Sequence, residues 1–204
     1  MRPDKILFID TETGGLDPSK NSLLSIALVV WQEFEITFAK EILVNDGVLN
    51  ATSRALEING IDLAEHRKKA LWAKDVITEF DGFLSQHFDE GEKITLGGHN
   101  INFDVNFLKH FLTQHNYNWG QRFSHRYVDT ATILYYLYLS GKLKQKTLSS
   151  QEAFDLFGIQ VEGRHSALGD GVATARLFTT LLKITYKNVK ITHKKTTDHP
   201  SLFP

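Results

Sequence analysis

The stretch Lys-Ile-Leu-Phe-Ile-Asp-Thr-Glu, residues 5–12, decides the fold of this chain of 204 residues. Residues 5–9 form a short continuous apolar run, which is typical of a buried central strand. Asp10 and Glu12 end that strand, and side chains at positions i and i+2 of a strand point to the same side. Two such carboxylates repel each other unless a cation lies between them. Their hard oxygen atoms suit Mg²⁺ or Mn²⁺, although a pair of solvated acids is the alternative interpretation.

The remainder of the chain predicts an α/β fold. Two β-prone runs, 23–31 and 34–44, are separated by Gln32 and Glu33, which suit a tight hairpin turn. A fourth strand is expected at 93–96. Helical spacing of apolar residues and helix start and stop signals predict helices at 51–58, 74–88, 104–115, 129–139, 147–157 and 167–185. The expected order is β-β-β-α-α-β-α-α-α-α, a mixed sheet flanked by helices.

The composition narrows the class of protein. Hydrophobic residues make up 42% and charged residues 23% of the chain, as in a soluble globular domain. The chain has no Cys, which excludes disulfides, thiolate metal sites and a Cys nucleophile, and fits the cytoplasm. No apolar stretch suits a signal peptide or a membrane span, so we expect no membrane partner. The net charge of −1 argues against a protein that coats nucleic acid, but not against an enzyme that grips a few phosphates.

Two later segments combine a histidine with an acid at the start of a helix. His99-Asn100-Ile101-Asn102-Phe103-Asp104 follows a predicted strand and a Gly-Gly turn, so Asp104 lies in the first helical turn, where the helix dipole favours a carboxylate. His165 falls in a loop, and Asp170 falls in the opening turns of the next helix. Each acid alone is explained by its place at a helix start. The ordered set of acids and histidines is not explained in this way.

The three segments together resemble the DEDD superfamily of 3′→5′ exonucleases, in its His-containing branch. The family pattern is D-x-E in the first strand, H-N-x-x-F-D at a middle helix and H-x-x-x-x-D before a late helix. The resemblance extends from about residue 5 to 182. Further likenesses are Thr13-Gly14-Gly15-Leu16-Asp17-Pro18, Asn59-Gly60-Ile61 and Val128-Asp129-Thr130. Some of these elements look most like the proofreading epsilon subunit of bacterial DNA polymerase III.

The resemblance implies an RNase H-like fold and a two-metal mechanism. It implies that Asp10, Glu12, Asp104 and Asp170 hold two Mg²⁺ or Mn²⁺ ions, and that His165 is the general base. Elementary chemistry agrees, because two divalent ions neutralise four carboxylates and let a phosphate approach. A histidine with an unperturbed pKa of about 6.5 can accept a proton at neutral pH.

The segment that follows the first acids is the expected substrate contact. Two adjacent glycines let backbone N–H groups approach a ligand, and Leu16 would wedge against bases; the alternative is a flexible turn. Phe103 could stack on a base or pack in the core, and Asn100 could line the site or cap a helix. The expected substrate-binding residues are Thr13, Gly14, Gly15, Leu16, Asn100 and Phe103.

The motifs include no residue that would recognise the 2′-hydroxyl of RNA, so both DNA and RNA stay possible as substrates. The likeness to proofreading subunits favours DNA; the alternative is an RNA-trimming exonuclease of the oligoribonuclease or RNase T type. Other hypotheses are an inactive nucleic-acid-binding module and a subunit of a DNA polymerase assembly. Basic residues at Lys142–Lys146 suit a solvated loop, and the aromatic run 135–138 suits core and helix surface more than a base-stacking platform.

We expect an exonuclease domain at 1–186 and a basic C-terminal tail at 187–204. Leu202 and Phe203 close the tail, where nothing local would bury them. The stretch Ser201-Leu202-Phe203 resembles the end of the short motif by which bacterial replication proteins bind the sliding clamp. His199 stands where that motif usually has Gln. The sequence therefore allows a clamp anchor, and the alternative is a plain terminus.

Overall fold

A mixed six-stranded sheet forms the centre of the computed structural model, which describes residues 4–147, 149–163 and 166–186. The strand order is β4-β3-β2-β1-β5-β6. β2 pairs antiparallel with β1 and β3, whereas β5 is parallel to β1 and β6. The strands are β1 (Lys5–Thr13), β2 (Leu23–Gln32), β3 (Glu35–Asn45), β4 (Leu71–Trp72), β5 (Ile94–Gly98) and β6 (Phe123–Asp129). The predicted mixed sheet is confirmed.

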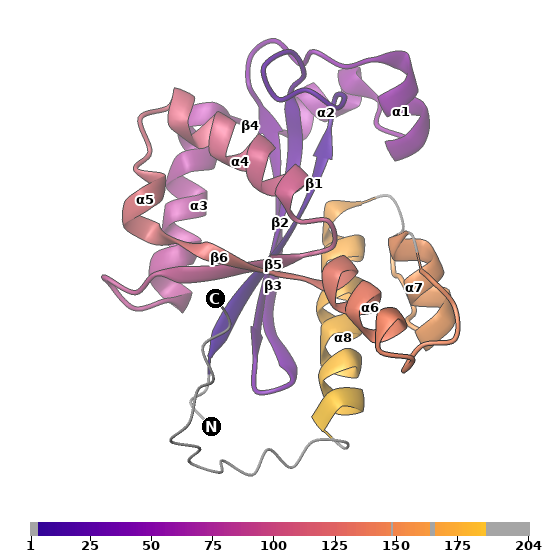
Figure 1. Cartoon of the computed structure of the whole chain (residues 1–204). Helices are drawn as coiled ribbons and strands as arrows, with labels where there is room; N and C mark the ends of the chain where they lie inside the picture. The colour runs from indigo at the N-terminus through magenta and orange to yellow at the C-terminus, as the bar shows by residue number, and fades with distance from the viewer. Residues whose placement is uncertain (1–3, 148, 164–165, 187–204) are drawn as a thin grey trace, which may run out of the picture.

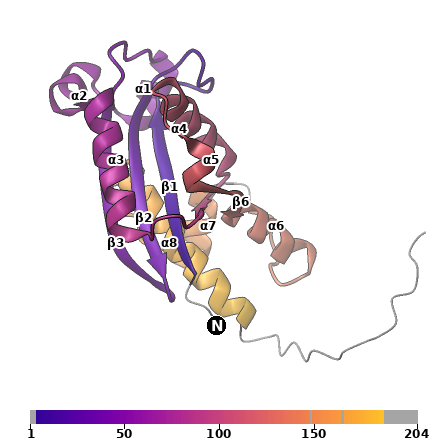
Figure 2. The same cartoon turned by 90° about the vertical axis from the view of Figure 1, so that its left-hand side faces the viewer.

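Helices cover both faces of the sheet (Figures 1 and 2). α3 and α4 lie on one face, and α8 lies on the other, with α6 and α7 packed against it. The helices are α1 (Ser53–Asn59), α2 (Leu63–Lys69), α3 (Ala73–His87), α4 (Asn102–Gln114), α5 (Trp119–Arg122), α6 (Thr130–Leu139), α7 (Ser150–Phe157) and α8 (Ala167–Tyr186). None of the helices in the described part of the chain is long and apolar enough to cross a membrane.

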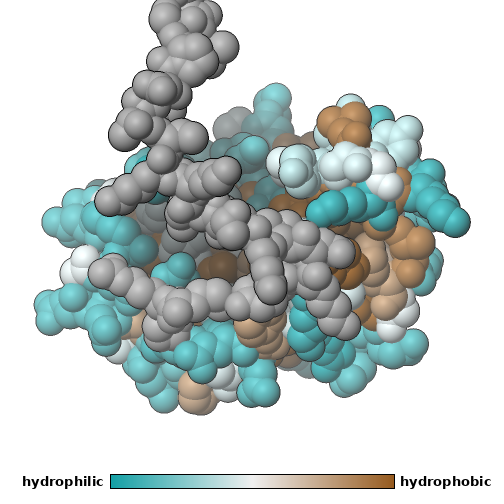
Figure 3. Space-filling model, turned by 60° about the horizontal axis from the view of Figure 1, so that its bottom comes forward, coloured by the Kyte–Doolittle hydropathy of each residue, from teal (hydrophilic) through white to brown (hydrophobic). Residues whose placement is uncertain are grey.

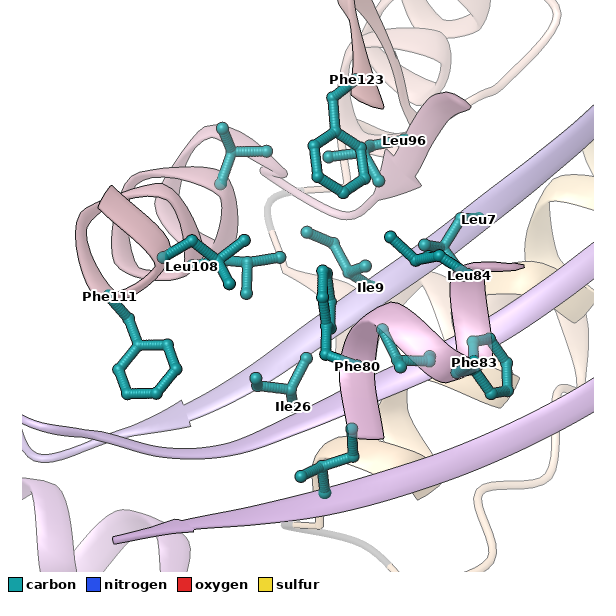
Figure 4. Close-up of a cluster of buried hydrophobic side chains, with 14 of the residues drawn as sticks. Leu7, Ile9, Ile26, Phe80, Phe83, Leu84, Leu96, Leu108, Phe111 and Phe123 are labelled. Carbon is teal, nitrogen blue, oxygen red and sulfur yellow. The ribbon is translucent and has the colours of Figure 1, made fainter. Parts of the chain in front are cut away.

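β1 reads as a continuous apolar run because both of its faces are buried. Leu7 and Ile9 join the cluster under α3 and α4, together with Phe80 and Leu108 (Figure 4). Phe8 points to the opposite face and packs on Phe178 of α8, with ring centroids 5.3 Å apart. Because side chains alternate along a strand, Asp10 and Glu12 continue the row that faces α8.

The hairpin between β2 and β3 turns at Glu33 and Phe34, so the prediction of Gln32 and Glu33 is wrong by one residue. Both turn residues have positive φ, at 52° and 71°, as a two-residue type I′ turn requires. Phe34 packs edge-on against Trp31, with ring centroids 6.0 Å apart. Burial of these rings offsets the strain of left-handed residues that are not glycine.

Four short elements escape the sequence prediction, which has no element at α2, β4 or α5 and no strand at β6. β6 carries the polar residues Ser124, His125 and Arg126 at the edge of the sheet. Because of them, the sequence of β6 lacks the apolar pattern that predicts a strand. α2 begins anew after the α1 turn because the Asp62 side chain accepts two backbone hydrogen bonds. The predicted tail, with Leu202 and Phe203, lies outside the described residues, so its boundary and its clamp motif stay predictions.

Candidate active site

Three carboxylates meet where the end of β1 faces the first turn of α8. Asp10 and Glu12 come from β1, and Asp170 comes from α8. One oxygen of each carboxylate lies within 4.8 Å of the others, and all three residues are half-buried. The spacing of D-x-E on a strand and the position of Asp170 at a helix start therefore bring these side chains together, as predicted.

Two glycines let α8 approach closely enough for this meeting. A Cβ on Gly171 would lie 3.2 Å from the Cβ of Ala27 and 3.5 Å from the Cβ of Asp10. A Cβ on Gly169 would lie 2.3 Å from the carbonyl oxygen of Glu162. The first glycine seats the helix on the sheet, and the second seats the incoming loop on the helix.

We expect Gly169→Ala to destabilise the protein. Alanine usually stabilises a helix interior by about 1 kcal/mol relative to glycine. Here the new methyl group would meet backbone rather than a flexible side chain, and overpacking of this kind typically costs about 1–3 kcal/mol, so the clash outweighs the gain. Gly82→Ala in α3 is the matched control, because its Cβ meets nothing within 4 Å and should stabilise. Urea unfolding that shifts both variants in the same direction would contradict this account.

Asp104 lies beside this cluster and not within it. It is buried in the first turn of α4, and the Thr11 hydroxyl donates a hydrogen bond of 2.7 Å to its Oδ1. Thr11 stands between Asp10 and Glu12 on β1 and points to the opposite face of the sheet. Asp104 is nevertheless close enough to Asp10 for their charges to repel. The structure thus brings together three of the four predicted acids and holds the fourth against the strand that carries two of them.

Burial raises the pKa values of Asp10, Glu12 and Asp104 in the metal-free protein, and neighbouring negative charges add to the rise. Burial, and next the negative charge of Asp104, raise the pKa of Asp10 well above its usual range. Burial, followed by the charges of Asp170 and Glu41, raises the pKa of Glu12 to about 8. Burial raises the pKa of Asp104 to about 7, although the Thr11 hydrogen bond opposes the rise.

Glu41 is a fifth acid that the sequence analysis misses. It lies on β3, and Ala27 of β2 pairs with both Glu41 and Asp10. The three residues form one row across the sheet, on the face toward α8. Only the strand register places Glu41 here, so no sequence motif could have identified it.

The donor set fits a divalent cation. Among the described residues, neither Asp10 nor Glu12 forms a salt bridge that would neutralise its charge. The three clustered donors are carboxylate oxygens, which are the ligands that hard divalent cations prefer. A cation at this position would relieve the repulsion that raises the pKa values of Asp10 and Glu12. Asp10, Glu12 and Asp170 are therefore able to hold a divalent metal.

The stability of the metal-free protein should fall as the pH rises. Glu12 binds its proton more tightly in the folded state, where its pKa is about 8, than in the unfolded state, where it is about 4.5. Between these values the folded state holds the extra proton, so the free energy of unfolding decreases with rising pH. We expect thermal unfolding in chelator to show a lower melting temperature at about pH 8 than at about pH 5, and Mg²⁺ to restore most of the difference. A melting temperature in chelator that rises over this range would contradict the assignment.

A hollow of about 720 Å³ opens beside the acid cluster. Leu16 lies at the rim of the hollow, with 87% of its surface exposed. Phe103 also borders the hollow, and its ring centroid lies 5.1 Å from that of Phe107. Glu12 also lines the hollow and so connects it to the acids. The lining residues are Thr11, Glu12, Thr13, Gly15, Leu16, Asp17, Asn21, Thr52, Arg54, Ala55, Ile58, Asn59 and Phe103. The mostly apolar wall suits a ring-shaped group next to a charged one.

The two glycines of the turn have different roles. The N–H of Gly14 donates to the Ser22 carbonyl at 2.8 Å, and a Cβ there would lie 2.1 Å from the Asn50 carbonyl oxygen. Gly14 therefore fixes the turn and does not offer its N–H to a ligand, unlike the expectation from the sequence. Gly15 lines the hollow, so its N–H stays a candidate for contact with a ligand there.

Asn100 and its neighbours fix the start of α4. Asn100 has a φ of 55°, and its N–H donates to the Asp129 carboxylate at 2.9 Å. His99 Nδ1 lies 3.0 Å from the Thr130 hydroxyl, which itself donates to the Gly98 carbonyl. Asn100 is exposed and does not line the hollow, so its predicted substrate contact stays a prediction. His165 lies outside the described residues.

Comparison with known proteins agrees with this geometry. The family model described as Exonuclease matches residues 7–178. The chain is 27% identical to the PolC-type DNA polymerase III of Thermotoga petrophila over 96% of its own length, but it spans only 14% of that protein. It is 28% identical to the 3′-5′ DNA exonuclease Cap18 of Escherichia coli, covering 92% of this chain and 97% of Cap18. Ribonuclease T of Wigglesworthia glossinidia brevipalpis is 29% identical, over 83% of this chain and 80% of that enzyme.

Solved structures show the same fold at low sequence identity. Escherichia coli Exonuclease I in complex with a dT13 oligonucleotide superimposes with a TM-score of 0.76 and 16% identity, over 90% of this chain and 42% of that one. Exonuclease X in complex with 5′ overhanging duplex DNA superimposes with a TM-score of 0.64 and 20% identity. The match covers 89% of this chain and 93% of that one. The RNase H-like fold expected from the sequence is confirmed. With the Exonuclease model matching residues 7–178 and the acids clustered at the end of β1, the chain belongs to the exonuclease family.

Proposed function

We propose that the protein is a metal-dependent 3′→5′ exonuclease that releases nucleoside monophosphates from single-stranded or frayed 3′ ends of DNA. One observation carries the proposal: Glu12 belongs both to the acid cluster and to the wall of the neighbouring hollow. A terminal nucleoside in the hollow would place its phosphate at the carboxylates. Family membership supports the same activity.

The metal-binding role is assigned to Asp10, Glu12, Asp104 and Asp170. Two Mg²⁺ or Mn²⁺ ions bound there would neutralise the acids and stabilise the attacking and leaving oxygens of the phosphodiester. Without the ions, the acid cluster would have nothing to attract the substrate phosphate or to activate the attacking water. The hydrogen bond from Thr11 holds the Asp104 carboxylate at the edge of this group.

The apolar wall would select an unpaired 3′ terminus. Leu16 at the rim and Phe103 beside it offer surfaces on which a base can pack once it has left its partner strand. Arg54 on α1 is the basic side chain in the wall and can contact a phosphate. His165, five positions before Asp170, is proposed to take the proton of the attacking water.

RNA trimming is the second candidate function. Its support is Ribonuclease T, of which the chain covers 80% at 29% identity. Support for DNA comes from Cap18, named as a DNA exonuclease, and from the PolC-type polymerase. The PolC-type relative also supports a working partnership with a DNA polymerase, which co-purification with a replicative polymerase would test.

Digestion of matched substrates with Mg²⁺ tests the proposed function. We expect single-stranded DNA and duplexes with a mismatched 3′ terminus to be shortened faster than fully paired duplexes, because melting a terminal pair costs free energy. DNA should be cut faster than RNA of the same sequence, and a 3′-phosphate should block the reaction. Preference for RNA would select the second candidate. Release of oligonucleotides from the 5′ end would refute both.

A further inference from the structure

α6 presents an aromatic surface to solvent. Leu134 and Leu137 are buried against the neighbouring helices, whereas Tyr135 and Tyr136 are 47% and 64% exposed. Tyr138 is also exposed. The tyrosines thus belong to the helix surface and not to the core. A contiguous group of exposed large side chains can mark a binding surface.

The exposed rings are arranged for stacking. The rings of Tyr135 and Tyr138 are nearly parallel, at 24°, with their centroids 6.5 Å apart. The ammonium group of Lys146 lies 5.3 Å from the Tyr135 ring centroid, within the range of a cation–π interaction. The loop after α6 therefore holds a positive charge directly beside the Tyr135 ring.

The charge of this region is complementary to nucleic acid. Residues 130–147 contain three lysines and no Asp or Glu, in a chain whose net charge is −1. Lys142, Lys144 and Lys146 are all exposed. Aromatic rings beside lysines are the combination by which proteins hold single strands, because bases stack on the rings while phosphates pair with the cations.

α6, the helix that carries this surface, starts beside elements that frame the proposed active site. α6 begins at Thr130, whose hydroxyl and neighbour Asp129 are bonded to the β5–α4 junction at Gly98 and Asn100. α6 also packs on α8, the helix that supplies Asp170. Figure 1 shows α6 and α7 on one side of α8, and on the right of Figure 3 hydrophobic residues are interspersed with polar ones. A strand that leaves the active site can therefore continue over α6.

We propose that Tyr135, Tyr136 and Tyr138, with Lys144 and Lys146, form a tyrosine–lysine platform that holds the single strand upstream of its 3′-terminal nucleotide. The inference rests on the proposed function and adds a second contact region to it. The platform touches no reacting atom, so it contributes to binding of long strands and leaves the chemical step unchanged. Short substrates that end within the hollow do not reach it.

Steady-state hydrolysis of a long and a minimal substrate tests the platform. The long substrate is a strand of about sixteen thymidines, and the minimal one is the p-nitrophenyl ester of thymidine 5′-monophosphate. Stacking contributes about 1–3 kcal/mol per base, so Tyr135→Ala with Tyr136→Ala should raise KM for the long strand about 10-fold or more. We expect kcat, and KM for the ester, to stay unchanged. Tyr135→Phe with Tyr136→Phe keeps the rings and should restore KM.

The role of the lysines is tested by the salt dependence of long-strand binding. Lys144→Ala with Lys146→Ala should reduce the salt dependence of long-strand binding by a slope of about 1.4, since each phosphate contact on a single strand contributes about 0.7. Arg67→Ala with Lys69→Ala on α2 makes the same charge change on exposed residues away from α6 and should leave the slope unaltered.

The outcomes separate the platform from the proposed function. Wild-type protein that hydrolyses neither substrate refutes the proposed function. An active wild-type enzyme whose Tyr135→Ala, Tyr136→Ala variant keeps its KM for the long strand overturns the platform alone. The platform is equally overturned if these substitutions instead convert a sedimenting dimer to a monomer, because the surface would then join two copies of the chain.

Discussion

Asp10→Asn is expected to abolish hydrolysis and, at the same time, to raise the melting temperature of the metal-free protein. Asp10 is surrounded by Asp104, Asp170, Glu12 and Glu41, whose charges add to the effect of burial in raising its pKa. An asparagine of the same shape removes the repulsion but also removes a proposed metal ligand. The residue thus supports function at the expense of stability, as strained sites do.

The expected magnitudes make the two effects separable. Loss of a metal ligand that contributes several kcal/mol corresponds to a fall in kcat of at least about 10³-fold. A gain of about 1 kcal/mol corresponds to about 2–4 °C in melting temperature for a domain of this size. Calorimetry in chelator at about pH 8 measures the second effect, with Asp89→Asn at an exposed position as the isosteric control. A lower melting temperature in Asp10→Asn would show that the carboxylate stabilises the fold.

His165→Ala is expected to lower kcat by at least about 10²-fold, the usual scale for loss of a general base. Titration calorimetry with Mn²⁺ should show metal binding close to that of the wild-type protein, because the proposed ligands are all carboxylates. This split between lost turnover and retained metal binding distinguishes a proton acceptor from a metal ligand.

A second histidine provides the control for His165. His125 on β6 is exposed and lies in none of the proposed contacts, so His125→Ala should leave kcat unchanged. Near-normal turnover of His165→Ala at neutral pH would mean that another group, or bulk hydroxide, takes the proton.

The central part of the fold could be predicted because local pattern and burial agree there. The apolar run of β1, covered on both faces, fixes a central strand, and the i, i+2 rule fixes the direction of Asp10 and Glu12. β6 could not be predicted, because its polar residues at the sheet edge resemble a loop. The turn at Glu33 and Phe34 depends on ring packing against Trp31, which the sequence pattern does not encode.

The candidate site was predictable as a set of residue types but not as an arrangement. A helix-start position places Asp104 near the sheet, yet only the structure shows its hydrogen bond to Thr11. Glu41 reaches the acids through the register of β3 and β2, which no single segment determines. The tyrosines of α6 have the spacing of an ordinary helix, and their exposure follows from which face packs on α8.

Digestion of a 5′-labelled single-stranded oligonucleotide, with Mg²⁺ or with excess chelator, tests the central claim most directly. With Mg²⁺, the labelled strand should shorten one nucleotide at a time from its 3′ end and release nucleoside 5′-monophosphates. In chelator, the strand should remain intact, because Asp10, Glu12 and Asp170 then hold no cation to activate the attacking water and stabilise the leaving oxygen. Undiminished hydrolysis in excess chelator, or early release of the 5′ label, would contradict the account.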